Sequence, residues 1–356
     1  MTKPVFFISS MSLEPWDWRN PWTKGIGGSE TSHIEMAYRL ANRGYKIKSY
    51  TPVEKPSMHN KVPYRHVDEA VSSKNGLYIW YRDPIKFDLD KHSKAKWWFI
   101  AQDVDYEGLW TKERLAKVDR YICLCKDHKN YTESKYPELR GRVYISSNGI
   151  RSNSIRLRSQ VKRNYNRLFF PSSPDRGIKL ILENWFRIRE INPKAEIYVA
   201  YGFDNMEAIV KLAGTGDWRY QYQIELQQLA KQPGVYFVGR QNQHRIYEYW
   251  RGTNIWAHPT DFPETSCITS MEAQALGAWP VTNNLWALRE NVNYGWMVQG
   301  IPQKSELVRT NWLHALEQAF HCRDEKTRKE MQEWALERFD WEKVVNQWDI
   351  WIKEDM

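Results

Sequence analysis

Two glutamates, Glu264 and Glu272, stand eight residues apart where a polar loop becomes a helix. The loop residues 264–266 lead into an expected helix over 267–276, and Gly277 can end it. A helix N-terminus presents free backbone N–H groups and a partial positive charge, which suit a diphosphate. Ionised carboxylates accept hydrogen bonds from hydroxyl groups. The segment therefore predicts a site for a ligand that carries both phosphates and hydroxyls.

A glycine-rich turn lies between the first expected strand, Val5–Ser9, and the first expected helix, 30–42. Gly27 and Gly28 in this turn let the backbone approach a ligand closely, and the helix start that follows favours an anion. The full Gly-x-Gly-x-x-Gly pattern is absent, which argues against a dinucleotide-binding enzyme.

Residues 262–282 resemble the Glu-x7-Glu signature of the retaining nucleotide-sugar transferases of glycosyltransferase family 4. In that family the first glutamate contacts hydroxyls of the donor sugar, and the second holds the ribose of the nucleotide. The resemblance implies these roles for Glu264 and Glu272. It also implies donor contacts at the residues that lead into the helix, which are Ser266, Cys267 and Ile268.

Two further loops match phosphate-binding loops of this family. The sequence Ser-Ser-Pro-Asp-Arg-Gly over 172–177 looks like the variant found in a subgroup of the family, in which the usual earlier arginine is absent. The resemblance implies that Arg176 stabilises the leaving diphosphate and that Ser172 or Ser173 donates hydrogen bonds to it. The glycine-rich turn before the first helix matches the loop that closes over the donor phosphates.

The acceptor is expected near the end of the strand 97–101, because parallel α/β sheets bind ligands at that edge. Gln102 follows this strand where many relatives have a histidine, and Asp103 either assists the acceptor hydroxyl or caps the next segment. Trp18 and Trp22 either stack on a sugar ring or a nucleobase or belong to ordinary packing. We expect no metal ion and no cofactor besides the nucleotide sugar, although an Asp-x-Asp pattern typical of metal-dependent transferases begins at Asp103.

Short apolar strands alternate with helical patterns throughout, which is typical of parallel α/β sheets. Besides the first strand, the expected strands are 45–51, 77–80, 97–101, 121–124, 143–146, 168–170, 197–200, 235–238, 255–257 and 279–282. The expected helices are 30–42, 178–191, 245–250, 267–276 and 341–353. The last has an apolar stripe at helical spacing that must be buried.

We therefore expect an α/β protein of two Rossmann-like parallel-sheet domains that face each other across a cleft, the GT-B architecture. Residues 1–150 form the acceptor domain, residues 151–167 a basic linker, and residues 168–340 the nucleotide-sugar donor domain. The C-terminal helix within 341–356 is expected to cross back onto the first domain, as it does in the family.

The net charge of +9 is unevenly distributed. Residues 1–150 contribute +7, residues 151–167 +6 and residues 168–356 −4. A basic first half suits an anionic glycan, a lipid headgroup or DNA phosphates, and a solvated face explains the charge equally well. No apolar run approaches the roughly 20 residues of a membrane span, and the four cysteines lack metal-ligand spacing. We expect a cytoplasmic protein with peripheral membrane contact as an open alternative.

These observations favour a retaining, metal-independent hexosyltransferase that uses a UDP-, GDP- or similar nucleotide sugar. Its hydroxyl acceptor would be an anionic or surface-presented glycan or lipid. Two alternatives stay open: a glycosyltransferase acting on a hydroxylated base of DNA, and a non-catalytic module that binds nucleotide sugars.

Overall fold

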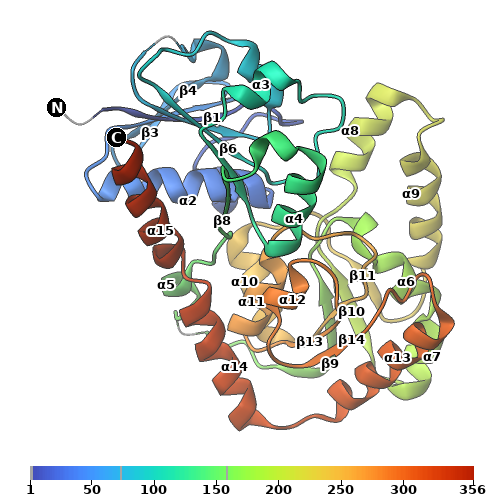
Figure 1. Ribbon diagram of the computed structural model, residues 1–356. Coiled ribbons are helices and arrows are strands. Elements are labelled where there is room, and N and C mark those ends of the chain that lie inside the picture. Colours follow the sequence, from blue (N-terminus) through green and yellow to red (C-terminus); the bar gives the residue numbers. More distant parts are fainter. Residues whose placement is uncertain (1–2, 73, 158) are drawn as a thin grey trace. The chain divides into compact units, whose positions relative to one another are not determined.

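The computed structural model describes residues 3–72, 74–157 and 159–356 (Figure 1). The chain packs as two units, one made of Met1–Gly149 with Phe339–Met356 and the other of Ile150–Arg338. Each unit is an α/β layer structure built on its own sheet of mainly parallel strands. Within these ranges no helix is both long enough and apolar enough to cross a membrane.

The first unit contains a sheet in which the described strands follow the order β3-β4-β2-β1-β5-β6-β7-β8. All neighbours pair in parallel except β3 and β4. The strands are β1 (Val5–Ser9), β2 (Ile47–Thr51), β3 (Ser57–His59), β4 (Val62–His66), β5 (Leu77–Tyr81), β6 (Lys96–Ile100), β7 (Arg120–Cys123) and β8 (Val143–Ile145). The helices are α1 (Asn20–Thr23), α2 (Gly28–Asn42), α3 (Lys112–Ala116), α4 (Lys126–Lys135) and α15 (Trp341–Asp355).

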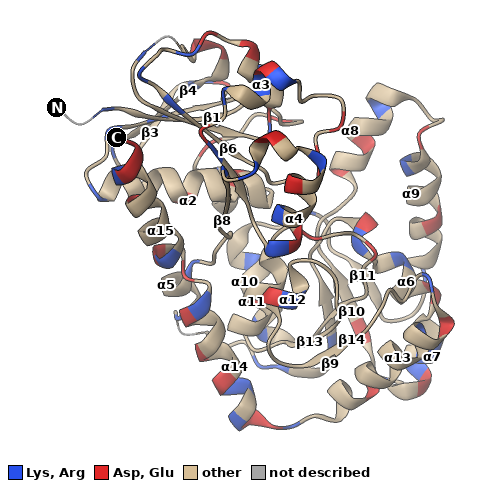
Figure 2. Ribbon diagram, in the orientation of Figure 1, with Lys and Arg blue, Asp and Glu red and all other residues tan. Residues whose placement is uncertain are grey.

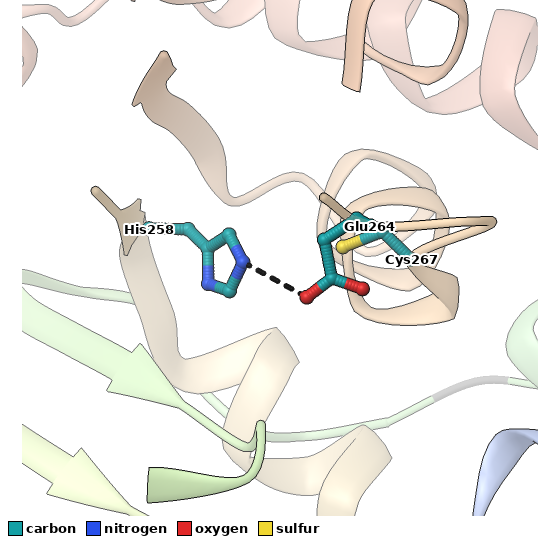
Figure 3. A group of neighbouring side chains, drawn as sticks. All are labelled: His258, Glu264 and Cys267. Atoms are coloured by element: carbon teal, nitrogen blue, oxygen red, sulfur yellow. Dashed lines mark ion pairs between the residues drawn. The ribbon is translucent and has the colours of Figure 1, made fainter. Parts of the chain in front are cut away.

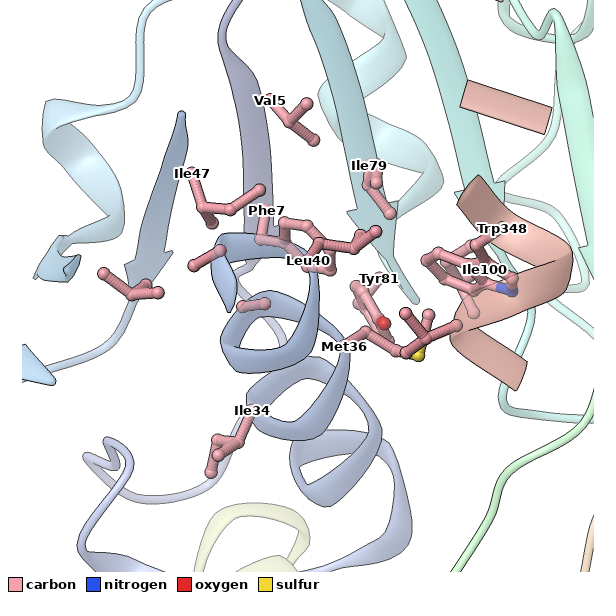
Figure 4. Close-up of a cluster of buried hydrophobic side chains, with 14 of the residues drawn as sticks. Val5, Phe7, Ile34, Met36, Leu40, Ile47, Ile79, Tyr81, Ile100 and Trp348 are labelled. Atoms are coloured by element: carbon pink, nitrogen blue, oxygen red, sulfur yellow. The ribbon is translucent and has the colours of Figure 1, made fainter. Parts of the chain in front are cut away.

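Alternate residues of these strands pack into separate cores on the two faces of the sheet, as the two-residue period of a strand requires. Phe7 and Ile79 join one core, into which α2 and α15 also project, and Trp348 enters it from α15 (Figure 4). Their neighbours Phe6 and Tyr78 join the core of the opposite face. The centre of the sheet is therefore buried on both faces, and its strands β1, β5 and β6 are nearly continuous apolar runs.

The C-terminal helix α15 belongs to the first unit although it follows the whole second unit in sequence. Trp341, Val345 and Trp348 on its apolar stripe are at most 1% exposed. The indole of Trp348 donates to Ser146 Oγ at 2.8 Å, and Arg120 donates to Asp355 near the end of the helix at 2.7 Å. The stripe predicted from the sequence is buried against the first sheet, as expected.

The second unit contains a parallel sheet in which the described strands follow the order β11-β10-β9-β12-β13-β14. The strands are β9 (Asn164–Phe170), β10 (Glu196–Val199), β11 (Val235–Phe237), β12 (Thr253–His258), β13 (Trp279–Asn283) and β14 (Trp296–Val298). The helices are α5 (Ser152–Ile155), α6 (Ile178–Glu183), α7 (Trp185–Ile191), α8 (Asp204–Ala213), α9 (Trp218–Leu229), α10 (Gln243–Gly252), α11 (Ile268–Ala275), α12 (Leu288–Asn291), α13 (Glu306–His321) and α14 (Glu325–Arg338).

Some elements differ from the sequence prediction. The hairpin of β3 and β4 was not predicted, because its turn places Asn60 and Lys61, rather than glycine, at positive φ. The helix expected over 178–191 is interrupted at Asn184, whose side chain donates to the backbone carbonyl of Leu180 at 2.8 Å. Side-chain bonds of asparagine to nearby backbone compete with helix continuation. Strand β14 and the helices α1, α3, α4, α5, α8, α9, α12, α13 and α14 were also not predicted.

The expected basic linker over 151–167 is partly regular structure, since it contains α5 and the first residues of β9. Arg163 donates to the backbone carbonyls of Thr253 and Leu276, which anchors its guanidinium inside the second unit. Arg167 and Arg156 form ion pairs with glutamates of the same unit, Glu196 at 2.6 Å and Glu333 at 3.0 Å respectively. Arg158, also counted in the predicted segment, lies outside the described residues.

Two of these cations are therefore paired with acids of the second unit, and a third is bound to backbone carbonyls there. Figure 2 shows basic and acidic residues interspersed along helices such as α14. The charge pattern of the sequence overstated the charge that this segment offers to a partner, because the pairing acids lie far away in sequence.

Candidate active site

The candidate donor site of the second unit lies where two loops leave adjacent parallel strands. One loop follows β9 and the other follows β12, which pairs directly with β9. Gly177 in the first loop has φ +117°, and a Cβ there would lie 1.9 Å from the backbone oxygen of Pro259 in the second loop. Only glycine permits so close an approach. The sequence Arg176-Gly177 thus brings its arginine beside the loop that carries Glu264.

The loop between β12 and α11 is held in place by Asn283 at the end of β13. The Asn283 side chain accepts a hydrogen bond from the Thr260 backbone N–H and donates one to the Thr260 carbonyl, both at 2.9 Å. The backbone N–H of Ala287 donates to the carbonyl of Glu264 at 3.0 Å. These bonds fix the position of the loop, as a binding site on a rigid scaffold requires.

Glu264 lies at this loop with its side chain 15% exposed. Its carboxylate oxygen is 3.5 Å from Nε2 of His258, the last residue of β12 (Figure 3). Burial acts to raise the pKa of the Glu264 carboxyl, but the His258 imidazole and the positive charge of Arg176 outweigh it and hold the pKa below its usual value. Glu264 is therefore a carboxylate at neutral pH and a strong hydrogen-bond acceptor.

Arg176 ends a short 3-10 turn, Pro174–Arg176, after β9. Its guanidinium lies over the ring of Phe262, a cation–π contact that orients the charge without using its N–H donors. Within the described part of the chain, its buried Nη1 has no hydrogen-bond partner. The Arg176 Nε lies 3.7 Å from the Asp175 carboxylate, and its Nη1 leaves a hydrogen-bonding group available for an anion.

The remaining donor-site candidates surround the start of α11. Cys267, the residue before the helix, has the left-handed φ of +52°, and its side chain makes no cap. The Ser172 hydroxyl is 3.3 Å from that of Thr269 in the first helical turn, so the structure places Ser172 at this helix start. Ser266 is buried and its carbonyl accepts from the Asn291 side chain. Ser173, in the loop after β9, and Ile268, the first residue of α11, are half-buried.

Glu272 lies on α11 and is 6% exposed. Its carboxylate accepts from Gln243 Nε2 at 2.7 Å and from Trp250 Nε1 at 3.3 Å, and Gln243 also accepts from Arg151 at 3.3 Å. Burial raises the pKa of Glu272 to about 7, with Arg151 and the two hydrogen bonds opposing the rise. Glu272 therefore titrates near neutral pH, which marks candidate functional sites.

The residues that contact Glu272 were not predicted from the sequence. Gln243 and Trp250 lie on α10, and Arg151 was counted only for its charge. Trp250 fell in a predicted helix, but a tryptophan or glutamine gives no sign in sequence of the carboxylate it will contact. The pairing follows from the packing of α10 against α11.

The candidates of the first unit form groups of their own. Asp103 follows β6, and both of its carboxylate oxygens accept from the Arg82 guanidinium, at 2.7 and 3.2 Å. Arg82 also lies 3.7 Å from Glu30 in the first turn of α2. A Cβ on Gly27 would meet the Glu30 carboxylate at 2.6 Å, so Gly27 makes room for this acid at the helix start where Gly28 begins α2. Asp103 thus carries an ion pair, which sequence reasoning missed because Arg82 is distant in the chain.

Gln102 and the two tryptophans have partners in the same unit. Gln102 and Asn148 exchange side-chain hydrogen bonds at 3.2 and 3.1 Å. Trp18 stacks on His59 with ring centroids 4.2 Å apart, and Trp22 is half-buried. The second acid of the Asp-x-Asp pattern, Asp105, accepts from Tyr136 at 2.9 Å and pairs with a lysine, so the two aspartates have different partners.

One family model matches most of the second unit. Residues 164–338 match the family model described as glycosyl transferases group 1. No curated protein matches the chain in sequence.

Solved structures with a similar fold extend over both units. The catalytic domain of starch synthase IV from Arabidopsis thaliana, bound to ADP and acarbose, has a TM-score of 0.69 at 11% identity, covering 100% of this chain and 99% of its own. HepE from Anabaena, in complex with UDP and glucose, has a TM-score of 0.66 at 14% identity, covering 99% and 100%. A glycosyltransferase from Rickettsia africae has a TM-score of 0.66 at 11% identity, covering 99% and 98%. The chain has the GT-B fold.

Proposed function

We propose that the protein is a retaining glycosyltransferase that moves a hexose from a nucleoside-diphosphate sugar to a hydroxyl acceptor. The observation that carries the proposal is the convergence, in the second unit, of an ionised carboxylate, a cation with an unused donor and the start of α11. Glu264, Arg176 and the helix start supply the groups that a sugar diphosphate needs. UDP in the HepE structure and ADP in the starch synthase structure support a nucleotide ligand.

In the proposed reaction Glu264 accepts hydrogen bonds from the donor sugar, and Glu272 accepts them from the ribose. Arg176 and the N-terminus of α11 stabilise the negative charge that develops on the departing diphosphate. No side chain is assigned as a covalent nucleophile, so positioning and electrostatic stabilisation supply the catalysis. Because Arg176 and the helix start replace a cation at the diphosphate, transfer needs no divalent metal.

The acceptor is proposed to be an anionic glycan or lipid headgroup that docks on the first unit, whose residues 1–149 include the +7 of the N-terminal half. Charge on the acceptor side raises the rate of capture of an anion and is screened by salt. The segment 151–167 has a smaller part in this proposal than in the sequence interpretation, because Arg163 and Arg167 are bound within the second unit.

The test compares Glu264→Gln and Glu272→Gln with Glu317→Gln, which changes an exposed acid of α13. UDP-glucose, GDP-mannose and ADP-glucose serve as donors, with nucleotide release followed over time and UDP, GDP and ADP binding measured by calorimetry. At pH 8, Glu272→Gln should weaken nucleotide binding by roughly 1–3 kcal/mol, the value of a charge-assisted hydrogen bond. Glu264→Gln should bind the free nucleotide as tightly as the control does. It should cleave the nucleotide sugar, and so form free nucleotide, more slowly. EDTA should leave the rate unchanged.

Three results would refute the proposal. Binding of nucleotide sugars without any release would favour the non-catalytic module. Unchanged nucleotide affinity in Glu272→Gln would remove the ribose assignment. Loss of activity in EDTA, restored by manganese or magnesium, would remove the metal-independent mechanism.

A further inference from the structure

Three side chains of metal-ligand type converge where the loop after β12 meets α11. They are His258, Glu264 and Cys267, an imidazole, a carboxylate and a thiol (Figure 3). One ligand atom from each lies within 4.8 Å of the other two. Among the described residues, no other group of three or more histidine, cysteine, aspartate or glutamate side chains brings its ligand atoms this close together. The residues come from a strand end, a loop and a helix start, so tertiary structure brings them together.

The histidine of this group has an unusual environment. His258 is fully buried; within the described residues its Nδ1 has no hydrogen-bond partner, and its Nε2 lies 3.5 Å from the Glu264 carboxylate. Its ring stacks on Trp256 with centroids 4.9 Å apart and on Phe170 at 5.6 Å, which fixes the plane of the imidazole. Buried polar atoms are nearly always hydrogen-bonded, and an exception needs an explanation such as a bound ion.

The donor set selects the kind of ion. Magnesium and calcium prefer oxygen ligands, whereas thiolate and imidazole suit zinc and related transition metals. Zinc binds cysteine sulfur at about 2.3 Å and histidine nitrogen or carboxylate oxygen at about 2.0–2.2 Å. In a tetrahedral site those bonds place the ligand atoms about 3.3–3.6 Å apart. The observed separations, at most 4.8 Å, would need to close by at most about 1.2–1.5 Å, through rotation of the Glu264 and Cys267 side chains.

We propose that His258, Glu264 and Cys267 form a site for a thiophilic divalent cation such as Zn²⁺. Three protein ligands leave one tetrahedral position for water or a ligand group, as in many zinc sites. The Arg176 charge acts on Glu264 and opposes a second cation there. The metal ion therefore competes with the Arg176 cation for the Glu264 carboxylate.

Occupation of this site would have a consequence for the donor. The cation engages the Glu264 carboxylate, which the proposed function assigns to hydroxyls of the donor sugar. Zn²⁺ and the donor sugar then exclude each other, and the ion acts as an inhibitor that a chelator reverses. This consequence rests on the proposed function, whereas the binding of the cation does not.

The site is tested on the full chain by titration with Co²⁺, whose thiolate complexes show a charge-transfer absorption in the near ultraviolet. The band should appear in the wild type and be displaced by Zn²⁺. It should vanish in Cys267→Ser and persist in the matched control Cys322→Ser, whose sulfur lies after α13. His258→Gln should weaken Co²⁺ binding at least about tenfold. Loss of a residue that only hydrogen-bonds to a metal ligand already costs about this much affinity, and loss of a ligand should cost no less. Arg176→Gln should tighten it, because a positive charge is removed.

Circular dichroism and thermal unfolding of each variant separate loss of the site from loss of the fold. Absence of the band in folded wild-type protein, or a band that survives Cys267→Ser, would overturn the proposal. So would a band that vanishes equally in Cys322→Ser.

The consequence for the donor is measured separately, by calorimetry of UDP-glucose and ADP-glucose with and without saturating Zn²⁺. A lower donor affinity in Zn²⁺, absent in Cys267→Ser, supports the competition. A cobalt band together with donor binding that Zn²⁺ does not change would leave the metal site standing and overturn the assignment of Glu264 to the donor sugar. Donor binding without a cobalt band would overturn the metal site and leave the proposed function standing.

Discussion

The protonation of Glu272 provides a test that depends on the fold and on the site together. Its carboxylate is buried on α11, and burial raises its pKa from the ordinary 4.5 to about 7. One pKa unit corresponds to about 1.4 kcal/mol, so a rise of about 2.5 units represents roughly 3 kcal/mol. This magnitude is large compared with the effect of most surface acids.

The sign of the effect follows from proton linkage. Below pH 4.5 the carboxyl is protonated in both the folded and the unfolded chain. Between about pH 4.5 and pH 7 the unfolded chain loses this proton while the folded chain keeps it, so the free energy of unfolding falls as the pH rises. Above pH 7 the folded chain contains a buried carboxylate, and the stability contributed by the protonated form is fully lost. Glu272 therefore contributes stability at acid pH that disappears through pH 7.

Urea unfolding of the wild type and of Glu272→Gln at pH 5 and pH 8 measures this contribution. Glutamine is neutral at both values, so the variant lacks the pH dependence of this one group. The stability difference, variant minus wild type, should increase by roughly 2–3 kcal/mol from pH 5 to pH 8. The exposed-acid control Glu317→Gln should run parallel to the wild type. If Glu272→Gln also runs parallel, Glu272 has an ordinary pKa and the account of its burial is wrong.

The same protonation should control donor binding if ribose hydroxyls donate to Glu272. The carboxylate is the better acceptor, so affinity for UDP-glucose should fall by up to about tenfold per pH unit below pH 7. Binding at pH 6 should release a proton, which calorimetry in two buffers of different ionisation enthalpy detects. Glu272→Gln should bind weakly and independently of pH over this range. A wild-type affinity that is flat from pH 5.5 to pH 8 would contradict the ribose assignment.

Two further predictions concern the loops and charges around the site. Gly177→Ala should destabilise the second unit by at least about 2 kcal/mol in urea unfolding. The reason is that the new Cβ would lie 1.9 Å from the Pro259 oxygen at a φ of +117°. Stability like that of the wild type would show that the two loops do not approach each other as described. Arg163→Gln should lower stability by roughly 1–3 kcal/mol through two backbone carbonyls left without their donor, whereas Lys162→Gln, at an exposed position, should change it by less than about 0.5 kcal/mol. Equal effects of the two substitutions would contradict the difference between an anchored and a solvated cation.

Much of the fold could be predicted from local pattern. Strand β1 has the predicted bounds, and the apolar stripe of α15 showed that this helix must be buried. These predictions succeed because a strand buried on both faces and a helix with one apolar face repeat their pattern within a few residues. The hairpin of β3 and β4 was not predicted, because its strands are short and polar and its turn lacks glycine.

The candidate site could be predicted only in part. The residue types and order of the segment around Glu264 and Glu272 indicated a ligand with phosphates and hydroxyls. The hydrogen-bond and ion-pair partners of the basic residues were not predictable, because Arg163 and Arg82 bind groups far away in sequence, the Leu276 carbonyl and the Asp103 carboxylate. Charge summed along a chain does not show which cations are already paired in the folded molecule.

The two glutamates separate what the sequence by itself determined from what only the tertiary structure decided. The sequence determined that two identical carboxylic acids stand eight residues apart around a helix start. The tertiary structure decided that they ionise differently: the pKa is lowered at Glu264 beside His258 and Arg176, and raised to about 7 at Glu272. The reason is that a nearby cation stabilises the ionised form of a carboxyl group and lowers its pKa, whereas burial destabilises that form and raises the pKa. Which effect prevails depends on the groups that folding brings close.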